Sequence, residues 1–182
     1  MAGFRSITPS ISINTQSGQL RTELLNTFAR LDGQLSQAPY RLSTQNGPSG
    51  NVGTGETPMM TFTLNFGTLT QIGASILIFA CGTTAGNANN KTFSLKLGST
   101  TIFTSGAVAL NNKDWVFQGE IVFNGGSSQI TWGQFTSNGS ASIVETNTST
   151  ESLASNKDIV FAGTGGATDD ISITYYKALL IN

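Results

Sequence analysis

The sequence predicts a mainly β protein: an antiparallel, jelly-roll-like β-sandwich preceded by an extended N-terminal arm and one amphipathic helix. Three observations predict this class. Charged residues make up only 10 % of the chain, and polarity comes instead from Ser, Thr, Asn, Gln and 21 Gly, a composition typical of turn-rich β proteins. From residue 59 onward, short runs alternate apolar and polar residues as half-buried strands do. A single earlier stretch has a sustained helical period.

Residues 1–17 are predicted to form an extended attachment arm. Ile7, Ile11 and Ile13 alternate with Ser and Thr, and Phe4 adds one large apolar side chain. A terminal segment of this kind frays unless something holds it. We therefore expect these four residues to dock on a partner protein or on a neighbouring subunit.

Residues 18–38 are predicted to form an amphipathic oligomerisation helix with a coiled-coil-like apolar seam. The seam consists of Leu20, Leu24, Phe28, Leu31 and Leu35. Because so short a helix is marginal alone in water, its seam needs a partner, either the β-domain of its own chain or the same helix in other copies. The second is favoured because the next segment, 39–58, is rich in Gly, Pro, Ser and Asn and suits a linker.

Residues 59–182 are predicted to form the sandwich, with about eight or nine short strands. The run Ile76–Cys81 is apolar on both faces, which indicates a central strand. The run Trp115–Phe123 alternates most cleanly, and Asn124-Gly-Gly126 predicts a hairpin after it. The apolar ending after Tyr175 predicts a last strand at the centre of a sheet or along an oligomer axis. The number and spacing of these strands favour a jelly roll.

Aromatic residues are expected to line the inner face of the sandwich and to supply most of the core. The predicted members are Phe62, Phe66, Phe79, Phe93, Trp115, Phe117 and Trp132. The single cysteine, Cys81, closes an apolar run and is expected to be buried and inert.

The side chains that usually perform catalysis are scarce. Histidine is absent, which removes the commonest general base and the commonest neutral metal ligand. A pair of carboxylates for glycoside hydrolysis would come from the acids of the sandwich. These are Asp114, Glu120, Glu145, Glu151, Asp158, Asp169 and Asp170. We predict that the chain is not an enzyme and that it uses no cofactor or metal.

Two weaker signals leave alternatives open. Asp169 and Asp170 follow a Gly-rich loop, so they either bind calcium through oxygen ligands or are exposed in an ordinary loop before the last strand. The aromatic residues Trp132, Tyr175 and Tyr176 either stack on sugars, helped by Asn and Thr on loops, or belong to the core like most aromatic residues on strands.

Charge and hydropathy restrict the partners. The formal net charge of −1 gives no electrostatic case for nucleic acid. The first residues lack the apolar core of a signal peptide, and no apolar run approaches membrane-spanning length. We therefore expect no membrane insertion and synthesis in the cytoplasm of a host cell. A surface with so few charges favours self-association.

Four blocks of strand and turn residues form a distinctive pattern: 79–98, 101–107, Asp114-Trp115 and 167–173. This pattern resembles a recurrent module of tailed-bacteriophage virion surface proteins, which include tail-fibre tips, head fibres and capsid decoration spikes. The resemblance covers roughly the C-terminal two-thirds of the chain. It implies a trimeric jelly roll carried on an N-terminal attachment region, without enzymatic activity.

The leading prediction is therefore a non-enzymatic bacteriophage virion structural protein. It would be a homotrimeric capsid decoration or head-fibre spike, anchored to a capsid or tail shell protein through its arm and helix. One alternative is a tail-fibre or spike receptor-binding protein that recognises host surface glycan through loops 82–90 and 163–170. The other is a free carbohydrate-binding module or a glycan-active enzyme.

Overall fold

The computed structural model of the chain describes residues 40–138 and 142–181. The chain divides into two compact units, residues 1–38 and 39–182, and the described residues all belong to the second. They form eleven strands and no helix. The predicted arm (1–17) and helix (18–38) lie outside the described residues.

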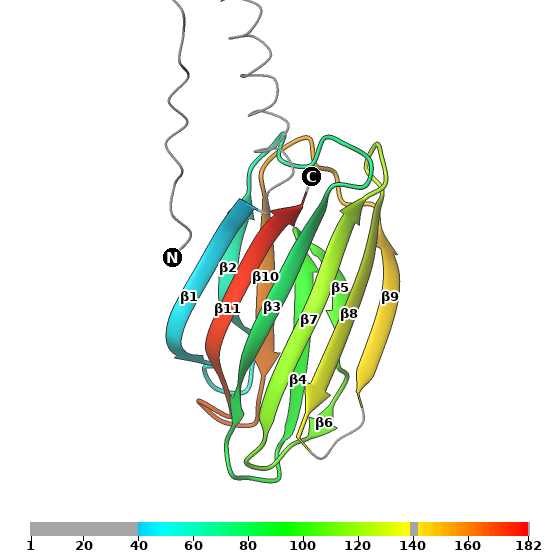
Figure 1. Cartoon of the computed structure of the whole chain (residues 1–182). Helices are drawn as coiled ribbons and strands as arrows, with labels where there is room; N and C mark the ends of the chain where they lie inside the picture. Colours follow the sequence, from blue (N-terminus) through cyan, green and yellow to red (C-terminus); the bar gives the residue numbers. More distant parts are fainter. Residues whose placement is uncertain (1–39, 139–141, 182) are drawn as a thin grey trace, which may run out of the picture. The chain divides into compact units, whose positions relative to one another are not determined.

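The strands form two antiparallel sheets that pack face to face as a sandwich (Figure 1). The six-stranded sheet contains, in order, β1 (Tyr40–Gly50), β11 (Ile171–Ile181), β3 (Ser75–Thr84), β7 (Asp114–Phe123), β8 (Gln129–Ser137) and β9 (Ile143–Ser149). The five-stranded sheet contains, in order, β2 (Thr57–Leu64), β10 (Lys157–Thr164), β4 (Asn90–Leu97) and β5 (Thr100–Thr104), with β6 (Val108–Ala109) paired to β4. The predicted antiparallel β-sandwich is confirmed.

The two most apolar strands lie inside the six-stranded sheet. The run Ile76–Cys81 belongs to β3, which pairs with β11 on one side and β7 on the other. The apolar chain end belongs to β11, which lies between β1 and β3. The interior position of β3 was predicted from the sequence, and that of β11 was one of two predicted alternatives, because a strand with neighbours on both sides tolerates apolar residues on both faces.

The predicted linker 39–58 is wrong for most of its length. Residues Tyr40–Gly50 form β1, which pairs with β11 along its whole length. Two register shifts, between Arg41 and Ser43 and between Asn46 and Ser49, interrupt the pairing. Bulges of this kind break the alternation of side chains, and an edge strand tolerates Gly and Pro, so the sequence of β1 resembles a loop.

Aromatic rings fill the space between the sheets. The ring of Phe93 on β4 lies 4.3 Å from that of Phe135 on β8 and 5.0 Å from that of Trp115 on β7, centroid to centroid. Phe103 and Phe117 form a second pair at 4.9 Å. These pairs cross from one sheet to the other and hold them together through buried apolar area.

The predicted aromatic inner face is correct in part. Phe62, Phe93, Trp115 and Phe117 are buried in the core as expected. Three others are not. Phe66 is 68 % exposed on a loop, while Phe79 and Trp132 are half-buried and occupy the outward positions of β3 and β8.

Glycines at the centre of the six-stranded sheet make room for the rings. Gly119 on β7 pairs with Gly133 on β8. A Cβ atom on Gly133 would lie 2.7 Å from the ring of Phe103, and one on Gly119 would lie 2.8 Å from the ring of Phe117. Side chains at these two positions would push the rings, and with them the sheets, apart.

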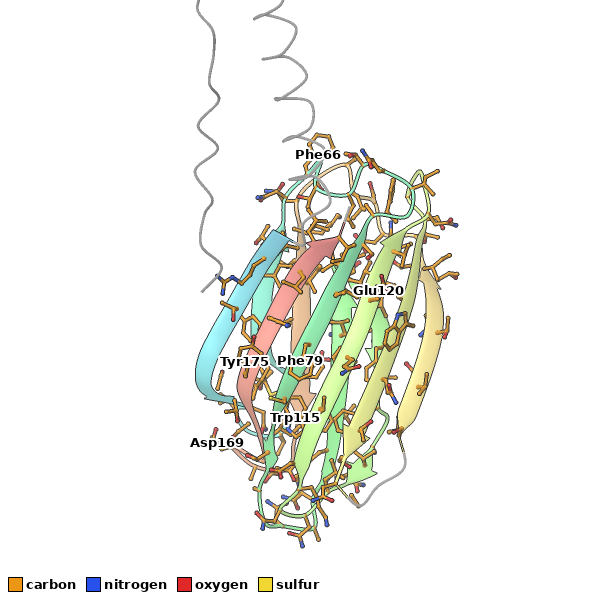
Figure 2. All side chains as sticks on the ribbon, viewed as in Figure 1. Phe66, Phe79, Trp115, Glu120, Asp169 and Tyr175 are labelled. Carbon is orange, nitrogen blue, oxygen red and sulfur yellow. The ribbon has the colours of Figure 1, made fainter. Side chains whose placement is uncertain are left out.

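The sandwich has two distinct ends. Tyr40, where the described chain begins, pairs with Leu180, near its end, so both termini of the sandwich lie at one end. The loops 51–56, 85–89 and 165–170 meet at the other end, where Asn51 bonds to Ile171 and Ala85 to Asp170. Figure 2 shows this separation, with Phe66 at the first end and Asp169 at the second.

Candidate functional site

The outer face of the six-stranded sheet carries an extended apolar surface, here called the six-strand outer face. Its side chains alternate with the core residues along β3, β7, β8, β9 and β11. The apolar members are Leu77, Phe79, Cys81, Val116, Val122, Ile130, Trp132, Val144, Tyr175, Leu179 and Ile181. Val116, Ile130 and Val144 are 37 %, 41 % and 61 % exposed. Polar residues interrupt this surface, since Phe79 pairs with Lys177 and Gln118 and Val144 with Gln134. Exposed apolar side chains gathered on one face are nevertheless a feature of interaction sites.

A shallow groove of about 210 Å³ lies at the centre of this face. It is lined by Leu77, Ile78, Phe79, Gln118, Gly119, Trp132, Lys177 and Leu179. The Trp132 Nε1 donates a hydrogen bond of 3.0 Å to Glu120 Oε2 on the neighbouring strand. The rings of Phe79 and Tyr175 lie 6.1 Å apart, and Figure 2 shows both residues, with Glu120, on the sheet facing the viewer.

The outer face of the five-stranded sheet, here called the five-strand outer face, is polar by contrast. Its outward residues are Thr61, Thr63, Ser94, Lys96, Thr101, Asp158 and Val160. Thr63 Oγ1 donates to Asp158 Oδ1 at 2.7 Å, and Ser94 Oγ donates to Glu56 Oε1 at 2.6 Å. Lys96 forms an ion pair with Glu56, and the hydrogen bond from Lys96, followed by that from Ser94, lowers the pKa of the Glu56 carboxyl.

A buried polar cluster joins the loops at the end opposite the termini. Asp170 is 1 % exposed. It accepts hydrogen bonds from Asn87 Nδ2 at 2.5 Å, from Asn89 Nδ2 at 3.0 Å and from the backbone N–H groups of Gly166 and Ala167. Burial alone would raise the pKa of Asp170, but these four donors outweigh it and lower that pKa to about 2.

Two more side chains complete this loop network. The fully buried Lys91 donates from Nζ to Asn87 Oδ1 and to Asn89 O, each at 2.9 Å. The fully buried Asn51 donates to Gly53 O and Ala167 O and accepts from the Ile171 N–H. Asn87 therefore lies between the cation of Lys91 and the anion of Asp170, which fixes two loops to each other.

The two alternatives for Asp169 and Asp170 both need correction. Asp169 is exposed, as expected of an ordinary loop, but Asp170 is buried. Both oxygens of Asp170 accept N–H donors, which occupies the lone pairs that a calcium ion would use. Among residues 40–138 and 142–181, no cluster of three or more His, Cys, Asp or Glu is arranged to hold a metal ion.

The other acids considered for glycoside hydrolysis have separate partners. Glu145 accepts from the Thr104 N–H at 2.8 Å, and Glu151 forms an ion pair of 2.8 Å with Lys157, which lowers the pKa of Glu151. Glu120 is bonded to Trp132, and Asp158 to Thr63. None of these acids lines the central groove.

A second groove, of about 310 Å³, lies at the end where the termini meet. Its lining includes the exposed Phe66 together with Leu69, Phe123 and Leu153. Ile72, on the same loop as Phe66, is 75 % exposed. Among the described residues, no charged side chain lines this groove.

The remaining predicted site residues divide into three groups. Those assigned to oligomerisation and attachment all lie outside the described residues: Phe4, Ile7, Ile11, Ile13, Leu20, Leu24, Phe28, Leu31 and Leu35. Trp132 and Tyr175 lie on the six-strand outer face, whereas Tyr176 is buried in the core. Cys81 is half-buried on that same face, so its predicted burial is wrong. Its outward position on β3 follows from the alternation of the strand.

The six-strand outer face itself was not predicted as a site. Its signal in the sequence was the double-sided apolarity of β3 and the apolar end of β11. The apolarity of β3 predicted a central strand, and the apolar end of β11 predicted either the centre of a sheet or an oligomer axis. Both strands have a neighbour on each side, but this position alone does not cover their outward side chains.

Comparison with known proteins gives no relative. No protein-family model, no curated protein and no solved structure matches this chain. Among the described residues, none belongs to a helix with the length and hydropathy needed to span a membrane. The virion assignment made from the sequence therefore stays a prediction.

Proposed function

We propose that this chain is a non-enzymatic structural protein of a tailed-bacteriophage virion. In this proposal it is a homotrimeric capsid decoration or head-fibre spike. Residues 1–38 attach it to a capsid or tail shell protein, and the sandwich projects from the shell as a jelly roll. Three linked copies multiply weak attachments by raising the effective concentration of each arm.

The strand order supports the jelly roll. Without β6 and the β8–β9 hairpin, eight strands remain. Numbered along the chain, they pair as first–eighth–third–sixth in one sheet and second–seventh–fourth–fifth in the other. Two sheets with this order arise when a long antiparallel hairpin is rolled up, which gives the two Greek keys of a jelly roll.

The observation that carries the proposal is the polarity of the sandwich. Tyr40, where the described chain enters the sandwich, and the last residues of β11 lie at the same end, which also carries the exposed Phe66. The opposite end is built from loops that the network of Lys91 and Asp170 fixes. A domain tethered at one end, with a rigid and polar opposite end, suits a projection from a particle surface.

Labelling of particles tests the proposal. Antibodies raised against residues 39–182 are applied to purified particles of the virus that encodes the chain, and the label is located by electron microscopy. We expect labelling on the head surface, and we expect recombinant full-length protein, but not a version lacking residues 1–38, to bind particles from which it was omitted. Particles without label, with the protein free in the lysate, would overturn the proposal.

A receptor-binding role is the second candidate. Loops 82–90 and 163–170, which were expected to recognise glycan, meet through Asn87, Asn89 and Asp170 at the end away from the termini. Binding of the full-length chain to a glycan array, lost when Asn87 and Asn89 are replaced by Ala, would favour this candidate. Asn111→Ala provides the control, since Asn111 is exposed on another loop.

A further inference from the structure

We infer that the six-strand outer face is the surface through which copies of this chain contact one another. The inference deepens the oligomeric part of the proposed function and rests on it, because it names the surface that joins the copies. Three observations carry it: the contrast between the two outer faces, the chemistry of the apolar side chains, and the distribution of charge.

The contrast between the two outer faces indicates which of them suits exposure to solvent. On the five-strand outer face, polar groups bond to one another, as Thr63 does to Asp158 and Ser94 to Glu56. On the six-strand outer face, Leu77, Val116 and Ile130 are each more than a third exposed, although polar residues such as Glu120 and Gln118 lie between them. Covering the apolar face would be favourable in proportion to the area removed from water.

The kind of side chain favours a protein occupant over a sugar. Sugars stack on the faces of aromatic rings, and here the rings are interrupted by branched aliphatic residues such as Leu77, Leu179 and Val122. The indole N–H of Trp132 is already donated to Glu120. Strands about 4.8 Å apart and residues about 3.3 Å apart give a patch roughly 20 Å wide in each direction, which fits the core of an ordinary protein interface.

The charges of the six-strand outer face favour a copy of the same chain. Arg41 on β1 and Lys177 on β11 are basic, whereas Asp114 and Glu120 on β7 are acidic. Within the described residues, none of these four forms an ion pair. One face therefore offers both a basic and an acidic side, and a second copy that is rotated against it can place Lys177 opposite Glu120. Net charge does not oppose this contact, since the chain carries only −1.

The test measures assembly of the full-length chain by analytical ultracentrifugation over a range of concentrations. Val116→Glu places a carboxylate on the six-strand outer face. Val160→Glu is the matched control, because Val160 points outward from β10 on the five-strand outer face. We expect Val116→Glu to raise the dissociation constant at least tenfold and Val160→Glu to leave it within threefold of the wild type.

A charge exchange provides the second arm, which stays informative if Val116→Glu fails to fold by circular dichroism. Lys177→Glu and Glu120→Lys are each expected to weaken assembly several-fold, and the double variant to restore it to within threefold of the wild type. A loss caused only by damage to the sheet would not be repaired by the second substitution.

The outcomes separate this inference from the proposed function. A wild-type chain that sediments as a single copy at every concentration overturns the homotrimer and this surface together. A wild-type oligomer that Val116→Glu and both charge changes leave intact overturns only the surface. If those variants assemble normally but lose binding to a glycan array, the face is a sugar site, and the inference is again wrong.

Discussion

The two outer faces of this sandwich differ although they belong to the same fold and the same chain. The five-strand outer face consists mostly of Thr, Ser and charged residues, which bond to each other across strands. The six-strand outer face carries many Leu, Ile, Val and aromatic residues, between polar ones such as Gln118 and Gln134. A sandwich needs only its inner faces to be apolar in order to fold. The second apolar face therefore points to a use beyond folding.

The two outer faces differ more from each other than any cluster of acidic residues differs from its surroundings. Within the described residues, the buried acid Asp170 accepts hydrogen bonds from Asn87, Asn89 and the Gly166 N–H in the loops. The features left over are surfaces: one apolar sheet face and two ends of different character. Proteins whose function is assembly carry such features, because binding large partners needs area rather than a pocket.

The largest effect is expected from truncating an inward side chain of β8, compared with truncating an outward side chain of the same strand. Phe135 is 1 % exposed and its ring packs against that of Phe93, so Phe135→Ala should reduce the free energy of unfolding by about 3–5 kcal/mol. Trp132 lies on the outer face of the same strand, and Trp132→Ala should cost about 1 kcal/mol or less in the dissociated chain.

Urea unfolding in the Val116→Glu background, at concentrations below the dissociation constant of that variant, measures both values without the contribution of assembly. Comparable losses for the two variants would mean that Trp132 belongs to the core in solution. The distinction between the faces would then be wrong.

The second effect concerns Asp170, the buried carboxylate of the loop network. It differs from Glu56, which pairs with Lys96 beside the five-strand outer face and is 41 % exposed. Asp170→Asn should cost about 2–3 kcal/mol at pH 7, because an amide leaves N–H donors of the loop network unpaired. The pKa of Asp170 falls from 3.8 to about 2 on folding, so its stabilising contribution is complete above about pH 5 and is lost as the pH falls through 4 towards 2.

Unfolding curves from pH 7 to pH 2.5 check this dependence. The control is Asp169→Asn, since Asp169 is exposed and has φ of 60°, a conformation that Asn tolerates. It should remain within about 0.5 kcal/mol of the wild type. An Asp170→Asn variant with unchanged stability and an unchanged pH profile would contradict the assigned role of the loop network.

The third effect tests how closely the sheets are held. Gly133→Ala places a Cβ atom 2.7 Å from the Phe103 ring, and the resulting shift should cost about 1–3 kcal/mol. Gly55→Ala is the control because nothing lies within 4 Å of a Cβ atom there. Thermal unfolding of the two variants provides the measurement, and equal melting temperatures would show that the inner packing is looser than described.

The sequence predicted the sandwich and its interior strands because these depend on local patterns. The alternation of β7 and the double-sided apolarity of β3 are visible without knowing the neighbours. β1 was missed because its two register shifts interrupt that alternation. On β8, the outward set contains Ile130 and Trp132 while the inward set contains Thr131 and Gly133. Alternation alone then assigns the wrong set to the core.

The loop network was missed for a different reason. Its central acid, Asp170, bonds to Asn87 and Asn89, which are 83 and 81 positions away in the chain. No local pattern relates such residues, because the sheet topology alone brings them together. The same holds for the outer faces: each strand shows which residues alternate, but only the assembled sheet shows which side has a second layer.

The smallest effect is expected on the five-strand outer face, and it completes the comparison. Glu56 pairs with Lys96 and accepts from Ser94, but its side chain is 41 % exposed. Water and salt therefore screen the pair, and Glu56→Gln should cost less than about 1 kcal/mol. Because pairing lowers the pKa of Glu56, this small contribution is present at neutral pH and is lost as the pH falls below the ordinary range of a glutamate.

Urea unfolding with and without 1 M NaCl separates this surface pair from the buried network. The cost of Glu56→Gln should shrink in high salt, whereas the cost of Asp170→Asn should hardly change. Assembly of Glu56→Gln should equal that of the wild type, since the five-strand outer face is assigned to solvent. If Glu56→Gln weakened assembly relative to the wild type, the five-strand outer face would take part in the interface between copies. The contrast between the two outer faces would then no longer identify the surface through which copies contact one another.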